Sequence, residues 1–173
     1  MRFQGDCYRA HEPRFAATPL SGEGARARGG RFNPAGIPAL YLALTVEGMF
    51  AEMGHGFARR FDPLTICAYA ADMADVVDLR TEALCTAASV ASADLACAWA
   101  YELAMSHDPA SWRVARLLIF QGAAGVLVPS FATGARADAA NLVLWRWGPD
   151  LPHQLTVHDP REKLPRDQES WRQ

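Results

Sequence analysis

Residues 26–55 read RARGGRFNPAGIPALYLALTVEGMFAEMGH, and this stretch decides how the rest of the chain is interpreted. It opens in a Gly- and Arg-rich segment, where the pair Gly29-Gly30 allows a tight turn or a close approach of the backbone to a ligand. Residues 38–44 (PALYLAL) have the length and apolar character of a buried strand. Thr45 then predicts the N-cap of a helix whose apolar face carries Met49, Phe50, Met53 and Phe57.

Three side chains of this stretch are candidates for one ligand-binding site. Arg31 follows the glycine pair, and an arginine in such a loop can bind a phosphate through two parallel hydrogen bonds. Tyr41 lies on the buried strand, where its ring can pack against an aromatic or cationic ring. Glu52 lies at the edge of the apolar helix face, and a carboxylate there needs a partner because an unpaired buried charge is costly.

Each candidate also has a purely structural interpretation. Arg31 suits an exposed loop, and Tyr41 suits a core position with a satisfied hydroxyl. Glu52 suits an ion pair with Arg9 or Arg60. Spacing alone leaves these alternatives open.

Several common motifs are absent. The GGRFN segment lacks the GK[ST] of a phosphate-binding loop and the GxGxxG of a dinucleotide fold. Ser130 follows Val-Pro at a strand end, which suits a turn, and no GxSxG elbow marks it as a hydrolase nucleophile. His55 has no HExxH partner, so we expect no metal site. The cysteines form no CxxC pair and lie among apolar residues, which predicts buried free thiols at Cys7, Cys67, Cys85 and Cys97.

Composition narrows the function class. The chain has 173 residues, of which 50% are hydrophobic, so one soluble globular domain is expected. A net charge of −2 gives no reason to expect binding to nucleic acid or to an anionic membrane. The start of the chain lacks the apolar region of a signal peptide, and no apolar run is long enough to span a bilayer. We therefore expect a cytoplasmic protein.

The order of predicted elements favours the α+β class over regular βαβ units. Residues 11–37 are expected to form one long loop, which inside a compact domain is typical of a functional segment. We predict a domain over residues 1–158 and a charged tail over 159–173. The predicted strands cover residues 3–10, 38–44, 64–71, 76–79, 126–128, 141–147 and 154–158, and the further helices cover 81–88, 92–105 and 110–122.

The combination of motifs resembles the RES domain. Its specific parts are GGRFNPxG with Arg31, the strand YLA with Tyr41, Glu52 about ten residues later, and PS with Ser130 followed by NLVL. The family is named for its arginine, glutamate and serine, which here correspond to Arg31, Glu52 and Ser130. The resemblance runs from Tyr8-Arg9 to about Trp147, and residues 80–111 match only in character.

The resemblance implies a fold similar to that of the diphtheria-toxin-like ADP-ribosyltransferases, and consumption of NAD+ as the substrate. It implies that Glu52 stabilises the oxocarbenium-like ribose, that Arg31 binds the pyrophosphate or adjoining ribose, and that Tyr41 stacks on nicotinamide. Ser130 would position the ribose or the nicotinamide amide. Arg9 and Asn141 are second-rank candidates for contacts with NAD+ or for support of the site.

RES proteins are toxins of bacterial toxin–antitoxin modules, and their antitoxins carry an Xre-like domain. The compact chain is similar to the ParT branch, which transfers ADP-ribose to a protein such as phosphoribosyl pyrophosphate synthetase. An NAD+ glycohydrolase or phosphorylase that depletes NAD+ is the alternative. A non-enzymatic binding module is a weaker one, and an RNase-type toxin is disfavoured because a basic surface and a His-based acid–base pair are not evident.

Overall fold

The computed structural model describes residues 1–53 and 63–169, and its core is one mixed sheet. Seven strands of this part of the chain form the sheet in the order β4-β5-β6-β2-β1-β3-β7. Neighbouring strands are antiparallel except for β4 and β5. The strands are β1 (Phe3–His11), β2 (Leu40–Ala43), β3 (Thr65–Met73), β4 (Val76–Asp78), β5 (Gly125–Pro129), β6 (Ala140–Leu144) and β7 (His153–Val157).

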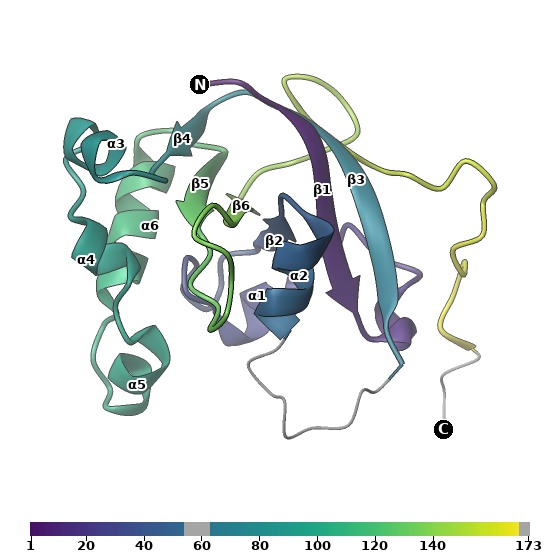
Figure 1. The fold of residues 1–173 in the computed structure, drawn as a ribbon. Helices are drawn as coiled ribbons and strands as arrows, with labels where there is room; N and C mark the ends of the chain where they lie inside the picture. The colour runs from purple at the N-terminus through teal and green to yellow at the C-terminus, as the bar shows by residue number, and fades with distance from the viewer. Residues whose placement is uncertain (54–62, 170–173) are drawn as a thin grey trace.

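The sheet is curled, so that its edge strand β4 returns to the start of β1 (Figure 1). The backbone of Val76 exchanges hydrogen bonds with Met1, whose ammonium group donates to the Val76 carbonyl at 2.7 Å. Asp75, which lies between β3 and β4, has a positive φ of 56°. β3 and β4, which are neighbours in sequence, therefore lie at different places in the sheet, and the curl encloses the apolar side chains between the strands.

Two hydrophobic clusters divide the core. The first consists mainly of strand residues and includes Leu42, Tyr69, Met73 and Leu142. The second lies where helices cover the sheet, and includes Leu79, Leu118 and Val143. The helices are α1 (Glu23–Arg28), α2 (Val46–Met53), α3 (Glu82–Ala87), α4 (Ser92–Leu95), α5 (Trp99–Ala104) and α6 (Ala110–Phe120), with a 3₁₀ turn at Pro13–Phe15.

Two of the expected elements are wrong. The segment 11–37 is not one long loop, because it contains the 3₁₀ turn and α1. The single helix expected over 92–105 is two short helices, α4 and α5. The carbonyls of Leu95 and Cys97, at and after the end of α4, accept hydrogen bonds from the Arg31 side chain. This tertiary contact uses acceptors that a continuous helix would have used internally.

The helix after β2 is partly as expected. Thr45 caps it, because its hydroxyl oxygen accepts a 3.0 Å hydrogen bond from the N–H of Gly48. Met49 is buried, but Phe50 is 48% exposed and does not belong to the apolar face. Phe57 lies outside the described residues. The shorter predicted helices and strands are confirmed with boundaries shifted by a few residues.

All four cysteines are free thiols, as expected, and Cys7, Cys67 and Cys85 are buried while Cys97 is half-buried. No helix within residues 1–53 and 63–169 is long and apolar enough to cross a membrane. Leu164, beyond the last strand, packs against the first hydrophobic cluster.

Candidate functional site

A pocket of about 310 Å³ opens where β1, β2 and β6 meet the C-terminal half of α2. The sheet register places Ala43 of β2 opposite Tyr8 of β1 on one side and opposite Asn141 of β6 on the other. Side chains from three strands therefore lie in one row beneath the helix. Arg9, Tyr41, Glu52, Met49 and Met53 complete much of the lining.

The Glu52 carboxylate is held in place by two donors from distant parts of the chain. The Ser130 hydroxyl donates to Oε1 of Glu52 at 2.6 Å, and Nδ2 of Asn141 donates to the same oxygen at 2.6 Å. Hydrogen bonds to an ionised group are short and strong, so this pair fixes the orientation of the carboxylate. Both bonds use Oε1, which leaves Oε2 available for a ligand hydroxyl.

The position in which Asn141 donates to Glu52 has a free-energy cost. Its Oδ1 is buried and has no hydrogen-bond partner in the part of the chain that the structure describes. Leaving such an acceptor unsatisfied costs about 1–3 kcal/mol. A side chain that tolerates this cost and also donates to Glu52 is typical of a functional position rather than of an optimised core.

The Arg31 guanidinium lies beside the pocket and does not line it. Its Nη1 donates to the carbonyls of Cys97 at 2.7 Å and Leu95 at 3.2 Å, and its Cζ lies 4.7 Å from the centroid of the Phe131 ring. Burial lowers the pKa of Arg31, whereas its Coulombic interactions with Cys97, Glu52 and Tyr41 act in the opposite direction. The hydrogen bonds recorded for this side chain use Nη1 alone among the described residues, so Nε and Nη2 remain for an anion.

The backbone around Arg31 is held by side chains from the far half of the chain. The indole N–H of Trp112 donates to the Gly30 carbonyl at 2.7 Å, and the indole N–H of Trp145 donates to the Phe32 carbonyl at 2.8 Å. Between them, the hydroxyl of Ser111 donates to the Arg31 carbonyl at 2.6 Å. Three consecutive carbonyls thus have side-chain donors, which makes this loop a rigid support for the guanidinium.

Tyr41 joins this loop to the pocket. Its hydroxyl accepts from the Phe32 N–H at 2.9 Å and donates to Oδ1 of Asn33 at 2.7 Å, while its ring lines the pocket. Burial raises the pKa of Tyr41 above its ordinary value of 10.0, so the hydroxyl keeps its proton at neutral pH. Asn33 is fully buried, and its Nδ2 also donates to three backbone carbonyls of residues 25, 34 and 37.

The glycine pair is required by this packing. A Cβ on Gly30 would lie 2.6 Å from the Tyr41 hydroxyl and 2.8 Å from Oδ1 of Asn33. Gly29 has a φ of 74°, and a Cβ there would lie 3.0 Å from the Trp112 ring. The close approach expected at Gly29-Gly30 is therefore real, but it is made to the protein's own side chains.

The structure brings most of the sequence-predicted residues together. Tyr41, Glu52, Arg9 and Asn141 line one pocket, Ser130 contacts Glu52, and Arg31 lies next to them. The suggested ion pair of Glu52 with Arg9 is wrong, because the Arg9 guanidinium donates to the carbonyls of Pro19 and Ser21. Arg60 and His55 lie outside the described residues. No cluster of three or more metal-ligating side chains occurs within residues 1–53 and 63–169.

Sequence reasoning missed the supporting residues. Neither Asn33 nor Trp112 was among the candidates that the sequence indicated. Ser111 and Phe131 carried no local signal, because their partners are 80 and 100 residues away in the chain. The one available signal was that the N–H of a buried tryptophan usually requires a hydrogen-bond acceptor.

Comparisons with known proteins identify the family and the fold of the chain. The family model of the RES domain matches residues 6–167. A chain of the crystal structure of the M. tuberculosis MbcT–MbcA toxin–antitoxin complex superposes with a TM-score of 0.59 and 24% identity, covering 92% of this chain and 84% of that chain. A search of curated proteins finds no match. The predicted α+β fold is confirmed by the structure and this likeness, and, by the match over residues 6–167, the chain belongs to the RES domain family.

Proposed function

We propose that the protein is the toxin of a toxin–antitoxin pair and that it consumes NAD+, transferring ADP-ribose to a target protein. Membership of the RES domain family supports the use of NAD+. Likeness to a chain of a toxin–antitoxin complex supports a toxic role with an antitoxin partner. We take residues 1–158 as the unit that carries this activity and 159–173 as a tail.

The observation that carries the proposal is the double hydrogen bond to Glu52. A carboxylate fixed by Ser130 and Asn141 at a pocket wall is preorganised, so it needs no reorientation when positive charge develops nearby. Its second oxygen can accept a hydrogen bond from a ribose hydroxyl. This arrangement suits a reaction in which a sugar becomes cationic, as in glycoside hydrolysis.

The reaction we propose breaks the bond between ribose C1′ and nicotinamide. The bonding electron pair leaves with nicotinamide, which becomes neutral, and the ribose carries the positive charge as an oxocarbenium ion. No general acid is needed, because the leaving group is cationic in NAD+. An acceptor group then gives an electron pair to C1′ and releases a proton. Glu52 stabilises the cation throughout.

The remaining residues bind and orient the substrate in this proposal. Arg31 binds the pyrophosphate through Nε and Nη2, while Nη1 keeps its two carbonyl partners. The Tyr41 ring stacks on nicotinamide, with its hydroxyl fixed by the Arg31 loop. Ser130 and Asn141 position Glu52, and Arg9 supports the pocket wall from β1.

The acceptor distinguishes the transferase from its alternative. A protein acceptor, possible targets of which include phosphoribosyl pyrophosphate synthetase, gives an ADP-ribosylated band. Water or phosphate gives free ADP-ribose or its phosphate ester, which is the activity of an NAD+ glycohydrolase or phosphorylase. Incubating the purified protein with adenylate-labelled NAD+ and a cell lysate separates these outcomes. Label that remains wholly in small molecules would contradict the transferase assignment.

The partner we propose is an Xre-like antitoxin. Its test is co-expression, in which the cognate antitoxin restores growth and lowers NAD+ loss. A non-enzymatic binding module is the competing class, since Glu52 could serve only to tie α2 to the loop after β5. That class predicts toxicity without NAD+ loss, and toxicity that survives Glu52→Gln.

A further inference from the structure

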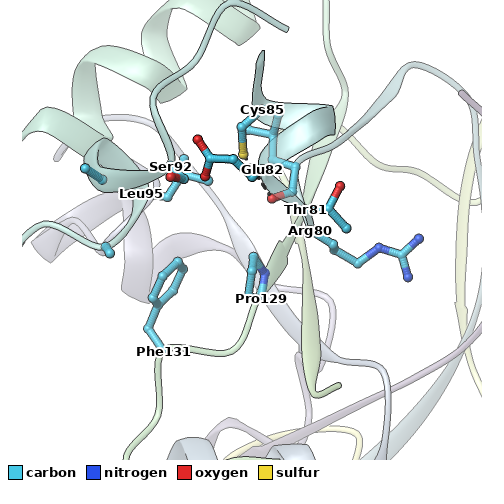
Figure 2. Close-up of a pocket in the computed structure, with 11 residues that line it drawn as sticks. Arg80, Thr81, Glu82, Cys85, Ser92, Leu95, Pro129 and Phe131 are labelled. Carbon is cyan, nitrogen blue, oxygen red and sulfur yellow. Dashed lines mark hydrogen bonds between the residues drawn. The ribbon is translucent and has the colours of Figure 1, made fainter. Parts of the chain in front are cut away.

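A second hollow, of about 330 Å³, lies beside the candidate site under α3 and α4. Figure 2 shows Pro129 and Phe131 on one side of it and Glu82, Cys85 and Ser92 on the other. Its inner wall is apolar, with buried Leu79, Cys85 and Leu95. Polar groups lie around it, among them Thr81, Glu82 and Ser92. Apolar walls with a few polar groups are typical of small-molecule and cofactor sites.

Residues 129–131 connect this hollow to the Glu52 pocket. Ser130 turns toward Glu52, whereas Pro129 and Phe131, its chain neighbours, line the second hollow. The Arg31 guanidinium covers the Phe131 ring and is bonded to the carbonyl of Leu95, which lines the same hollow. Arg31 therefore contacts two residues that line the second hollow and also interacts with the charge of Glu52, although it lines neither hollow itself.

Both hollows also open on the same face of the sheet. Tyr41 of the Glu52 pocket packs against the second hydrophobic cluster, as does Phe131, and Cys85 and Leu95 belong to that cluster. In Figure 1 the loop that follows β5 runs between α2 on one side and the group α3–α5 on the other. The second hollow is lined by residues of α3, α4 and this loop, and the Glu52 pocket by residues of α2 and the strands β1, β2 and β6.

The geometry points to the second hollow as the subsite for the adenosine end of NAD+. This inference rests on the proposed function and adds to it where the second half of the substrate lies. The order of charges matches the order of groups in NAD+: anionic Glu52 for the cationic nicotinamide ribose, cationic Arg31 for the pyrophosphate, and an apolar hollow for adenine. Ser92 and Glu82 provide hydrogen-bonding groups for the ribose hydroxyls and the exocyclic amine.

The volumes of the two hollows support the assignment of one half of NAD+ to each. Each hollow is close to the lower end of the range of about 300–1,000 Å³ that is usual for ligand sites. Neither alone suits a whole dinucleotide, whereas each suits one nucleoside half. The arrangement therefore predicts that affinity for NAD+ depends on both hollows, and that bond cleavage depends on the Glu52 pocket alone.

The test is a substitution that fills the second hollow without touching Arg31 or Glu52. Ala93 is exposed and lines the hollow, so Ala93→Trp places a bulky ring in it and removes no buried contact. The matched control is Ala91→Trp, which adds the same ring at an exposed neighbour that does not line the hollow. Ser92→Leu is a smaller second obstruction, and thermal melting verifies that each variant is folded.

Steady-state NAD+ consumption should show a KM raised by about tenfold or more in Ala93→Trp, with kcat within about twofold of wild type. Adenosine monophosphate should compete with NAD+ in the wild type, and its inhibition constant should rise in Ala93→Trp by a similar factor. Inhibition by nicotinamide should stay unchanged. Ala91→Trp should behave as wild type throughout.

Three results would overturn the inference. The first is an unchanged KM in both folded filling variants. The second is an equal loss of sensitivity to adenosine monophosphate and to nicotinamide, which would indicate a distorted site. The third is normal NAD+ kinetics with lost protein modification, which would assign the hollow to the acceptor protein. If the wild-type protein consumed no NAD+, that result would instead contradict the proposed function itself.

Discussion

The hydroxyl of Tyr41 donates a 2.7 Å hydrogen bond to Oδ1 of Asn33, a side chain that is fully buried. The same hydroxyl accepts from the N–H of Phe32 at 2.9 Å. Tyr41 therefore acts on the loop that carries Arg31 through its hydroxyl, and on the pocket through its ring. The two functions are separable by mutation.

Tyr41→Phe should destabilise the protein by about 1–3 kcal/mol, because Oδ1 of Asn33 and the N–H of Phe32 lose their partner while remaining buried. The ring is retained, so kcat for NAD+ consumption should fall far less than in Tyr41→Ala. Urea unfolding and steady-state kinetics measure the two effects. Equal losses of kcat in Tyr41→Phe and Tyr41→Ala would contradict a stacking role for the ring.

The two glycines Gly30 and Gly24 give a matched pair of substitutions. Gly30→Ala should destabilise the protein and impair the site, because its Cβ would lie 2.6 Å from the Tyr41 hydroxyl. Gly24→Ala should be neutral or stabilising by about 0.5–1 kcal/mol, because Gly24 lies within α1 and no atom lies within 4 Å of its added Cβ. Melting temperatures of the two variants compare these effects, and a stable, active Gly30→Ala would show that the loop packing is less strict than we infer.

Arg31→Lys should raise KM for NAD+ by about tenfold or more, although the charge is retained. An ammonium group cannot keep two carbonyl partners on one nitrogen while offering a planar fork to a phosphate. The matched control is Arg28→Lys, an exposed arginine of α1. NAD+ titrations of both variants test this, and wild-type KM in Arg31→Lys would exclude a bidentate role for Arg31.

The stability of the protein should fall as pH rises above about 9. Burial raises the pKa of the Cys7 thiol to about 12 from 9.0, and it also raises the pKa values of Tyr41 and Tyr69 above 10.0. Each group then keeps its proton in the folded state at a pH where the unfolded chain has lost it. The folded state binds more protons, so the free energy of unfolding decreases with rising pH.

Urea unfolding under reducing conditions at about pH 8 and about pH 10.5 measures this decrease. Cys7→Ala removes one of these groups, so its stability should depend less steeply on pH than that of the wild type, whatever its stability at neutral pH. A wild-type stability that is constant or rises across this interval would contradict the burial of these groups.

The local parts of the site could be predicted from sequence because their signals are local. The strand with Tyr41 is a short apolar run, and Thr45 is a typical N-cap immediately after it. The pair Gly29-Gly30 predicted that the backbone there lies close to another group. Glu52 stood out because a carboxylate beside buried Met49 required a polar partner.

The partners of these residues could not be predicted, because they depend on the tertiary fold. The Glu52 carboxylate is bonded to Ser130 and Asn141, which are 78 and 89 residues away in sequence. The break between α4 and α5 coincides with hydrogen bonds from Arg31 to carbonyls at and after the end of α4. Helix propensity over residues 92–105 depends only on those residues, so it could not predict an interaction with Arg31.

The central claim is that the Glu52 carboxylate promotes loss of nicotinamide from NAD+. The most direct measurement is nicotinamide release from NAD+ by the purified wild-type protein, by Glu52→Gln, and by Glu47→Gln, an exposed glutamate of the same helix. Glu52→Gln should be folded and slower by about 10²–10³-fold, with Glu47→Gln near the wild-type rate. A folded Glu52→Gln that releases nicotinamide at the wild-type rate would contradict the account.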